Sequence, residues 1–125
     1  MLKKKLLLVD DDDNIRFLAD MSLEDTWDVV CASSGKKALA IAREERPDVI
    51  LLDMMMPEMD GETTMRLLRE IDGFDKLPII FMTAKVQNHE VDHYLKIGAA
   101  GVIVKPFDPM KISEQIFGLM MNPVV

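Results

Sequence analysis

The sequence predicts an α/β fold in which a five-stranded, doubly wound parallel sheet of (βα)5 order carries helices on both faces. Three observations support this prediction. Five short apolar runs recur along the 125 residues, helical patterns alternate with them, and the runs lack the polar–apolar alternation of strands that face water on one side. Strands that alternate regularly with helices form parallel sheets through right-handed crossovers, so helices must cover both faces.

Each expected strand is a short run of leucine, valine, isoleucine or other apolar residues. The five strands are expected at residues 6–9, 29–32, 49–52, 79–82 and 102–104. Each expected helix repeats apolar residues at intervals of three or four positions, or is rich in Ala, Lys and Glu. The five helices are expected at residues 14–24, 35–45, 62–71, 88–97 and 109–120.

Capping residues support several of these boundaries. Asp12 or Asp13 can cap the first helix and Ser34 the second, because short polar side chains accept hydrogen bonds from the free amides there. Asp108 followed by Pro109 predicts the start of the fifth helix. Gly98 directly follows the fourth helix, where a left-handed residue commonly ends a helix.

Composition limits the classes of function. Apolar residues make up 49% of the chain and charged residues 30%, as in one globular domain, and no apolar stretch has the ~20 residues of a membrane span. The net charge of −7 disfavours direct nucleic-acid binding, because such a surface repels phosphates. The single cysteine, Cys31, permits no internal disulfide and suits a reducing cytoplasm. We therefore expect one cytoplasmic domain over residues 1–125, without membrane insertion and without an attached output domain.

Reactive side chains follow four of the five expected strands. Four aspartates, residues 10–13, follow the first strand, Asp53 the third, Thr83 the fourth and Lys105 the fifth. The carboxyl ends of parallel strands meet at one edge, where open α/β sheets bind their ligands. Any one of these residues alone would be read as an ordinary cap, turn former or solvated side chain. Their occurrence at four strand ends of one topology predicts a functional site.

The residue types at this edge indicate a cation and a phosphoryl group. Neighbouring carboxylates repel one another and stay ionised when a hard cation lies between them, and Mg²⁺ prefers such oxygen ligands. An aspartate carboxylate can attack phosphorus to form an acyl phosphate. The cation and a lysine ammonium then neutralise the charge of the transferring group, and a threonine hydroxyl can hydrogen-bond one of its oxygens.

Four segments resemble the receiver domains of bacterial response regulators, and the likeness extends over about residues 5–120. Residues 7–12 (LLVDDD) resemble the family's opening strand and acidic pair. Residues 47–61 (PDVILLDMMMPEMDG) resemble its phosphorylation segment, residues 78–84 (PIIFMTA) its switch strand and residues 105–107 (KPF) its Lys-Pro-Phe signature. The resemblance implies a flavodoxin-like fold and a role in two-component signal transduction, as in single-domain regulators of the chemotaxis type.

The same resemblance implies roles for individual residues. Asp53 would be the phosphoacceptor, and Thr83 and Lys105 would contact the phosphoryl group. The Mg²⁺ ligands would be Asp10, Asp11, Asp53 and the backbone carbonyl of Met55. Such a domain is a phosphoacceptor that catalyses only its own phosphorylation and dephosphorylation, not a conventional enzyme. Its phosphodonor would be a sensor histidine kinase or a histidine phosphotransfer protein, and its phosphorylated form would bind a downstream protein target.

Two features near the site depart from the family pattern. Many receivers place Tyr or Phe three residues before the signature lysine, where this chain has Val102, so the paired movement of threonine and that aromatic is not expected in its usual form. Met55 and Lys85, which flank the site, supply no carboxylate or amide to position an attacking water, which predicts slow self-dephosphorylation. The family's Lys-Pro bond is often cis, and Pro106 permits that geometry.

Other interpretations stay open at this point. Phosphatases of the haloacid dehalogenase type also use a strand-end aspartate, Mg²⁺, threonine and lysine, and residues 10–12 satisfy their Asp-x-Asp pattern, although Asp53 would then have no task. A receiver-like module that binds partners without phosphate is a second alternative, because of Val102. Within the receiver interpretation, a relay intermediate and a terminal output both fit. His89 and His93 have the i, i+4 spacing of a zinc site, but a solvated helix face explains them more simply.

Overall fold

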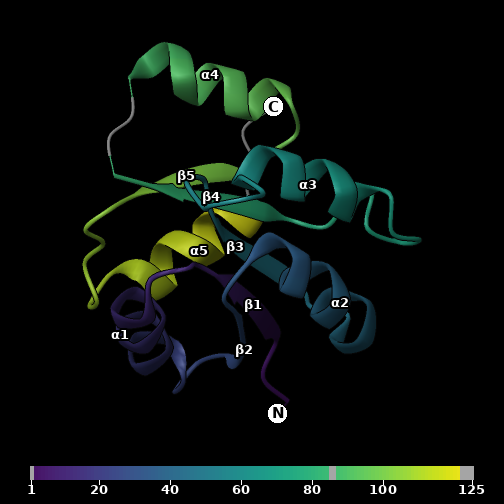
Figure 1. Ribbon diagram of the computed structural model, residues 1–125. Coiled ribbons are helices and arrows are strands. Elements are labelled where there is room, and N and C mark those ends of the chain that lie inside the picture. The colour runs from purple at the N-terminus through teal and green to yellow at the C-terminus, as the bar shows by residue number, and fades with distance from the viewer. Residues whose placement is uncertain (1, 85–86, 122–125) are drawn as a thin grey trace.

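The computed structural model describes residues 2–84 and 87–121 and has one sheet between two layers of helices (Figure 1). Its strands are β1 (Lys5–Val9), β2 (Asp28–Ala32), β3 (Val49–Asp53), β4 (Ile79–Thr83) and β5 (Gly101–Val104). Its helices are α1 (Asp13–Leu23), α2 (Gly35–Glu45), α3 (Gly61–Arg69), α4 (Asn88–Lys96) and α5 (Ile112–Met121). All strand pairs are parallel, in the order β2-β1-β3-β4-β5. The predicted fold class is confirmed.

The central strands explain the uninterrupted apolar runs of the sequence. Strands β3 and β4 are buried at every residue, and β1 is buried at every residue after Lys5. The two edge strands, β2 and β5, include half-buried and exposed residues. Because both faces of the central strands are covered by helices, neither face of these strands needs polar side chains.

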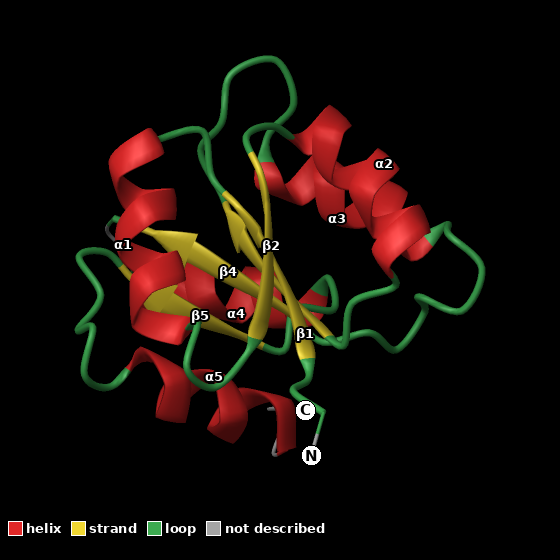
Figure 2. Ribbon diagram, turned by 90° about the horizontal axis from the view of Figure 1, so that it is seen from below, coloured by secondary structure: helices red, strands yellow, loops and turns green. Residues whose placement is uncertain are grey.

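Helices α2, α3 and α4 cover one face of the sheet and helices α1 and α5 cover the other (Figure 2). On the first face, Leu7, Ile50 and Phe81 belong to one apolar cluster. On the second face, Leu8 and Leu51 belong to another. Each fully buried large side chain stabilises the fold by about 1.5–3 kcal/mol, so the alternation of sheet residues between two clusters fixes both layers.

Trp27 and Cys31 both belong to the α1–α5 side of the core. The Trp27 side chain is 1% exposed, donates a hydrogen bond from Nε1 to Ser113 Oγ at 3.1 Å, and stacks on Phe117 with 4.5 Å between ring centroids. Cys31 is half-buried against the same cluster, and burial raises the pKa of its thiol. Both side chains thus pack in or against this part of the core.

Most helix boundaries follow the predicted caps, with one exception. Asp12 caps α1, Ser34 caps α2, and Gly98 follows α4 with a φ of 108°. The fifth helix begins at Ile112 and not at 109, because Asp108 forms a turn of its own. Its carboxylate accepts a hydrogen bond from Met110 N–H and its carbonyl accepts one from Ile112 N–H. None of the helices in the described ranges is both long and apolar enough to cross a membrane.

Candidate functional site

Strand order brings the predicted site residues to one edge of the sheet. β3 lies between β1 and β4, and the register pairs Asp53 with Met82, the residue before Thr83. One carboxylate oxygen from each of Asp10, Asp11 and Asp53 lies within 4.8 Å of the other two. Thr83 is 7% exposed at the end of β4, and its side chain makes no hydrogen bond with the described residues. The edge therefore combines three carboxylates with a neighbouring hydroxyl.

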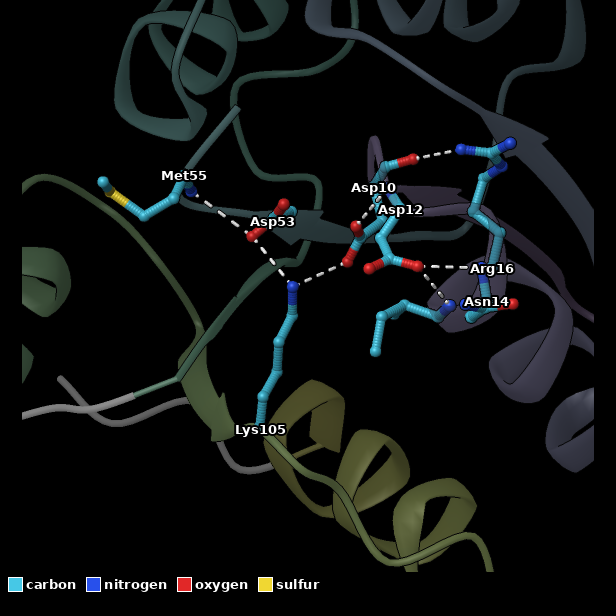
Figure 3. A network of polar contacts seen from close by, with 8 residues as sticks. Asp10, Asp12, Asn14, Arg16, Asp53, Met55 and Lys105 are labelled. Carbon is cyan, nitrogen blue, oxygen red and sulfur yellow. Dashed lines mark hydrogen bonds and ion pairs between the residues drawn. The ribbon is translucent and has the colours of Figure 1, made fainter. Parts of the chain in front are cut away.

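Lys105 joins two buried carboxylates of this edge (Figure 3). Its Nζ lies 2.8 Å from Asp10 Oδ2 and donates a hydrogen bond of 3.1 Å to Asp53 Oδ1. Asp10 is fully buried and Asp53 is 3% exposed, so the ammonium compensates two negative charges that water reaches poorly. Burial by itself lowers the pKa of Lys105, but its contacts with the two aspartates outweigh burial and raise that pKa. Lys105 is therefore a cation throughout the neutral range.

The carboxyl group of Asp53 has a raised pKa, so it binds its proton more tightly than an ordinary aspartate does. Burial raises its pKa to about 6, and the negative charge of Asp10 acts in the same direction. The ammonium of Lys105 and the amide of Met55, which donates to Asp53 Oδ1 at 3.3 Å, oppose this rise. With a pKa of about 6, roughly nine in ten of these groups are ionised at pH 7. Asp53 is thus available as a carboxylate nucleophile at neutral pH.

Asp10 is held in place at three of its atoms (Figure 3). Its Oδ1 accepts a hydrogen bond from Asp12 N–H at 2.9 Å, and its backbone carbonyl accepts one from Arg16 Nη1 at 2.8 Å. Its Oδ2 faces Lys105 and has no hydrogen bond of good geometry among the described residues. Arg16 also pairs with Asp13, which holds its guanidinium over the start of α1. The sequence did not identify Arg16 as a residue that supports the site. Its position three residues after Asp13, which allows an ion pair on one helix face, was the one sequence pattern that indicated a contact.

The loop after Asp53 returns tightly to the strand that it leaves. Gly61 N–H donates to the carbonyl of Met54 at 2.9 Å, and a Cβ on Gly61 would lie 2.5 Å from the carbonyl oxygen of Asp53. A side chain at Gly61 would therefore displace the backbone of Asp53. Glu58 completes the turn with a φ of 69°, in the left-handed region. The role of the Met55 carbonyl as a metal ligand stays a prediction.

Other sequence expectations have clear outcomes. The peptide bond between Lys105 and Pro106 is cis. His93 Nε2 lies 3.1 Å from Glu62 Oε1. Within the described ranges neither histidine belongs to a cluster of three or more possible metal ligands, whereas the three site aspartates form one. Lys85 lies outside the described residues.

The model of the response regulator receiver domain family matches residues 6–117. The chain belongs to this family. The receiver is 36% identical to the alkaline phosphatase synthesis transcriptional regulatory protein PhoP of Bacillus subtilis, over 95% of the receiver and 49% of PhoP. It is 34% identical to the DNA-binding response regulator MtrA of Mycolicibacterium smegmatis, over 92% of the receiver and 50% of MtrA. The receiver thus spans about half the length of the curated relatives that it matches.

Solved structures agree with this membership. The chemotaxis protein CheY4 of Vibrio cholerae superposes with a TM-score of 0.89 at 31% identity, covering 94% of the receiver and 99% of CheY4. A response regulator of Chloroflexus aurantiacus superposes with a TM-score of 0.87 at 27% identity, covering 97% of the receiver and all of the other chain. The receiver is therefore a phosphoryl-accepting domain of two-component signalling, and its family is a signalling family.

Proposed function

We propose that Asp53 accepts a phosphoryl group in a Mg²⁺-dependent reaction and that this modification switches a protein-binding surface. The observation that carries the proposal is the contact of Lys105 with two buried carboxylates, Asp10 and Asp53, at the carboxyl edge of the sheet. Two such carboxylates beside one ammonium leave a net negative charge in a poorly solvated place, which favours binding of a further cation.

The acidic residues fit Mg²⁺ by their chemistry and by the burial of their oxygens. Asp10, Asp11 and Asp53 offer only oxygen donors, which suit a hard cation, and Asp10 Oδ2 is buried beside the Lys105 ammonium without a hydrogen bond of good geometry among the described residues. We infer that these three carboxylates hold the ion together with the backbone carbonyl of Met55. When bound, the ion neutralises charge on the carboxylates and on the phosphoryl oxygens.

The receiver's own residues supply the remaining chemistry. One Oδ of Asp53 forms a bond to phosphorus while the bond from phosphorus to the donor breaks, and the donor leaves with that electron pair. Lys105, which already touches Asp53, is in reach of the negative charge that arrives on the phosphoryl oxygens. Thr83, at the end of the adjacent strand, would donate its hydroxyl hydrogen to one of these oxygens. The receiver in this way promotes its own phosphorylation. Dephosphorylation would use the same groups: water forms the new bond to phosphorus, the bond from phosphorus to Asp53 breaks with its electron pair left on the carboxylate, and inorganic phosphate leaves.

The proposed partners are those expected for a member of the receiver family. We propose a sensor histidine kinase or a histidine phosphotransfer protein as the donor and a protein as the downstream target. The single thiol, half-buried and without an internal disulfide partner, supports a cytoplasmic location. We also propose that residues 1–125 act as one receiver domain. The curated relatives named as transcriptional or DNA-binding regulators are about twice as long as this chain, which matches about half of each. We therefore do not attribute DNA binding or control of transcription to this chain.

The test is chemical labelling with a small phosphodonor. The purified protein is incubated with acetyl phosphate, with and without Mg²⁺, and the modified residue is located by intact and peptide mass spectrometry. We expect a Mg²⁺-dependent acyl phosphate on Asp53 that Asp53→Asn abolishes. Asp25→Asn, a change at an exposed aspartate outside the site, should label normally. Label on Asp10 or Asp11 would instead support a phosphatase, and absence of label with both acetyl phosphate and a cognate kinase would refute the proposal.

A further inference from the structure

Helix α4 is the helix least anchored in the core. It has no buried residue and no side-chain cap at its first turn, whereas each of the other four helices buries at least two residues. Figure 1 shows it above the sheet, beside α3. Its contacts with the apolar cluster on this face come from Tyr94 and, just after the helix, Ile97. A helix held by so few contacts can be repositioned by a small change beneath it.

Tyr94 rests on a residue of the strand that ends at the site. Its ring meets Phe81 edge-on, with 5.2 Å between centroids and 60° between planes. Phe81 is fully buried in β4, two residues before Thr83, so both side chains point to the same face of the sheet. The register pairs Phe81 with Val102 on β5, and Val102 and Tyr94 pack against the same cluster. The Tyr94 ring of α4 thus covers the β4–β5 pair, where Val102 occupies the position at which many receivers have Tyr or Phe.

The geometry points to Tyr94, acting through Phe81, as the residue that couples phosphorylation of Asp53 to the position of α4. This inference rests on the proposed function. Val102 can change only one side-chain torsion and is β-branched, which leaves it little freedom to swing between buried and exposed positions. Tyr94 has a long, half-buried side chain on the weakly held helix. In many receivers an aromatic residue of β5 moves together with the threonine. In this chain the contact between Phe81 of β4 and Tyr94 of α4 takes that role.

The path from a phosphoryl group on Asp53 to the ring of Tyr94 is short and contiguous. A phosphoryl oxygen on Asp53 would draw Thr83 toward it, and the carbonyl of Thr83 already accepts a hydrogen bond from Lys105 N–H at 2.8 Å. Movement of this strand end shifts Phe81, and edge-to-face ring contacts depend on orientation, so Tyr94 must follow. Tyr94 adjoins His93, whose contact with Glu62 ties α4 to α3.

The ionisation of Tyr94 is consistent with a packing role. Burial raises the pKa of its phenol, and the charges of Glu90 and Glu62 act in the same direction. The ring is therefore uncharged at neutral pH. The coupling depends on ring packing, which phenylalanine can also supply.

Tyr94 is the chain's single tyrosine, so it can be observed alone. The protein is produced with meta-fluorotyrosine and followed by fluorine NMR during phosphorylation by acetyl phosphate and Mg²⁺. We expect the resonance to shift on phosphorylation, to return as the acyl phosphate decays, and to stay unchanged in Asp53→Asn. In Phe81→Leu, which leaves the site residues unchanged, intact mass should still show the phosphoryl group, but the shift should be lost. An unchanged resonance in protein whose Asp53 is phosphorylated would overturn the inference and leave the proposed function standing.

Hydrogen exchange tests whether the helix responds through the ring. Phosphorylation should change the exchange of α4 amides in the original protein and in Tyr94→Phe, and this change should be lost in Tyr94→Ala. Lys96→Ala, an exposed change on the same helix, should behave as the original protein does. If Tyr94→Ala is labelled and keeps the full exchange response of α4, the inference is wrong. Failure of all variants, the original protein included, to label on Asp53 would overturn the proposed function and this inference with it.

Discussion

Replacing Asp53 by asparagine should stabilise the protein in metal-free solution. The pKa of Asp53 is raised from the ordinary 3.8 to about 6, so the folded chain binds this proton more tightly than the unfolded chain does. Stability is therefore lost as the pH rises from about 4 to about 6, and the loss is complete above that window. At about 1.4 kcal/mol for each pKa unit, the ionised carboxylate costs about 3 kcal/mol at pH 7. Since Lys105 keeps Asp10 as a partner, we expect Asp53→Asn to gain about 2–3 kcal/mol.

Urea unfolding of both proteins provides the measurement. Trp27 is the single tryptophan and is 1% exposed, so its fluorescence reports loss of the core. The gain of Asp53→Asn should be full at pH 7 and should fall to about 0.5 kcal/mol at pH 4, where the folded carboxyl is already protonated. The exposed control Asp25→Asn should stay within about 0.5 kcal/mol of the original protein at both pH values. Equal or lower stability of Asp53→Asn at pH 7 would refute the reasoning.

Magnesium should offset the stability gain of Asp53→Asn. Binding to the folded state alone stabilises it by about 2.7 kcal/mol when the ion is present at 100 times its Kd. The original protein offers Asp53 as a ligand and the asparagine variant does not offer that carboxylate. We therefore expect Mg²⁺ to raise the urea midpoint of the original protein by more than that of Asp53→Asn. An equal rise in both would place the ion away from Asp53.

Three further substitutions test how the site is held. Arg16→Met removes the guanidinium that anchors the Asp10 carbonyl, so Mg²⁺ binding measured by calorimetry should weaken by about 10-fold, and an unchanged Kd would contradict this role. Gly61→Ala puts a Cβ 2.5 Å from the carbonyl oxygen of Asp53, so it should lower the free energy of unfolding by about 1–3 kcal/mol in urea and slow the labelling of Asp53 by acetyl phosphate. Unchanged stability would show that the loop can relax. Arg69→Met loses hydrogen bonds to three loop carbonyls and should cost about 2 kcal/mol, seen as a lower Tm, whereas an unchanged Tm would mean that those carbonyls find other donors.

The sequence by itself determined the order of the elements and the identity of the reacting groups. Apolar runs without alternation predict central strands, because a strand covered on both faces needs no polar side, and β1, β3 and β4 are buried in this way. Parallel strands have their carboxyl ends at one edge, so Asp53, Thr83 and Lys105 could be assigned to that edge from their positions after apolar runs. Caps such as Ser34 were predictable because they act over three residues.

Only the tertiary structure decided how these groups interact. The two contacts of Lys105, the raised pKa of Asp53 and the anchoring of Asp10 by Arg16 depend on distances between segments that the sequence does not relate. The sequence places Tyr94 at one of the apolar positions of a helix, and only the folded structure shows its ring against Phe81. Periodicity and spacing report which residues share a face or an edge, because they follow from backbone geometry. Burial, electrostatic coupling and ring contacts arise from packing between distant segments, so they appear only when the chain is folded.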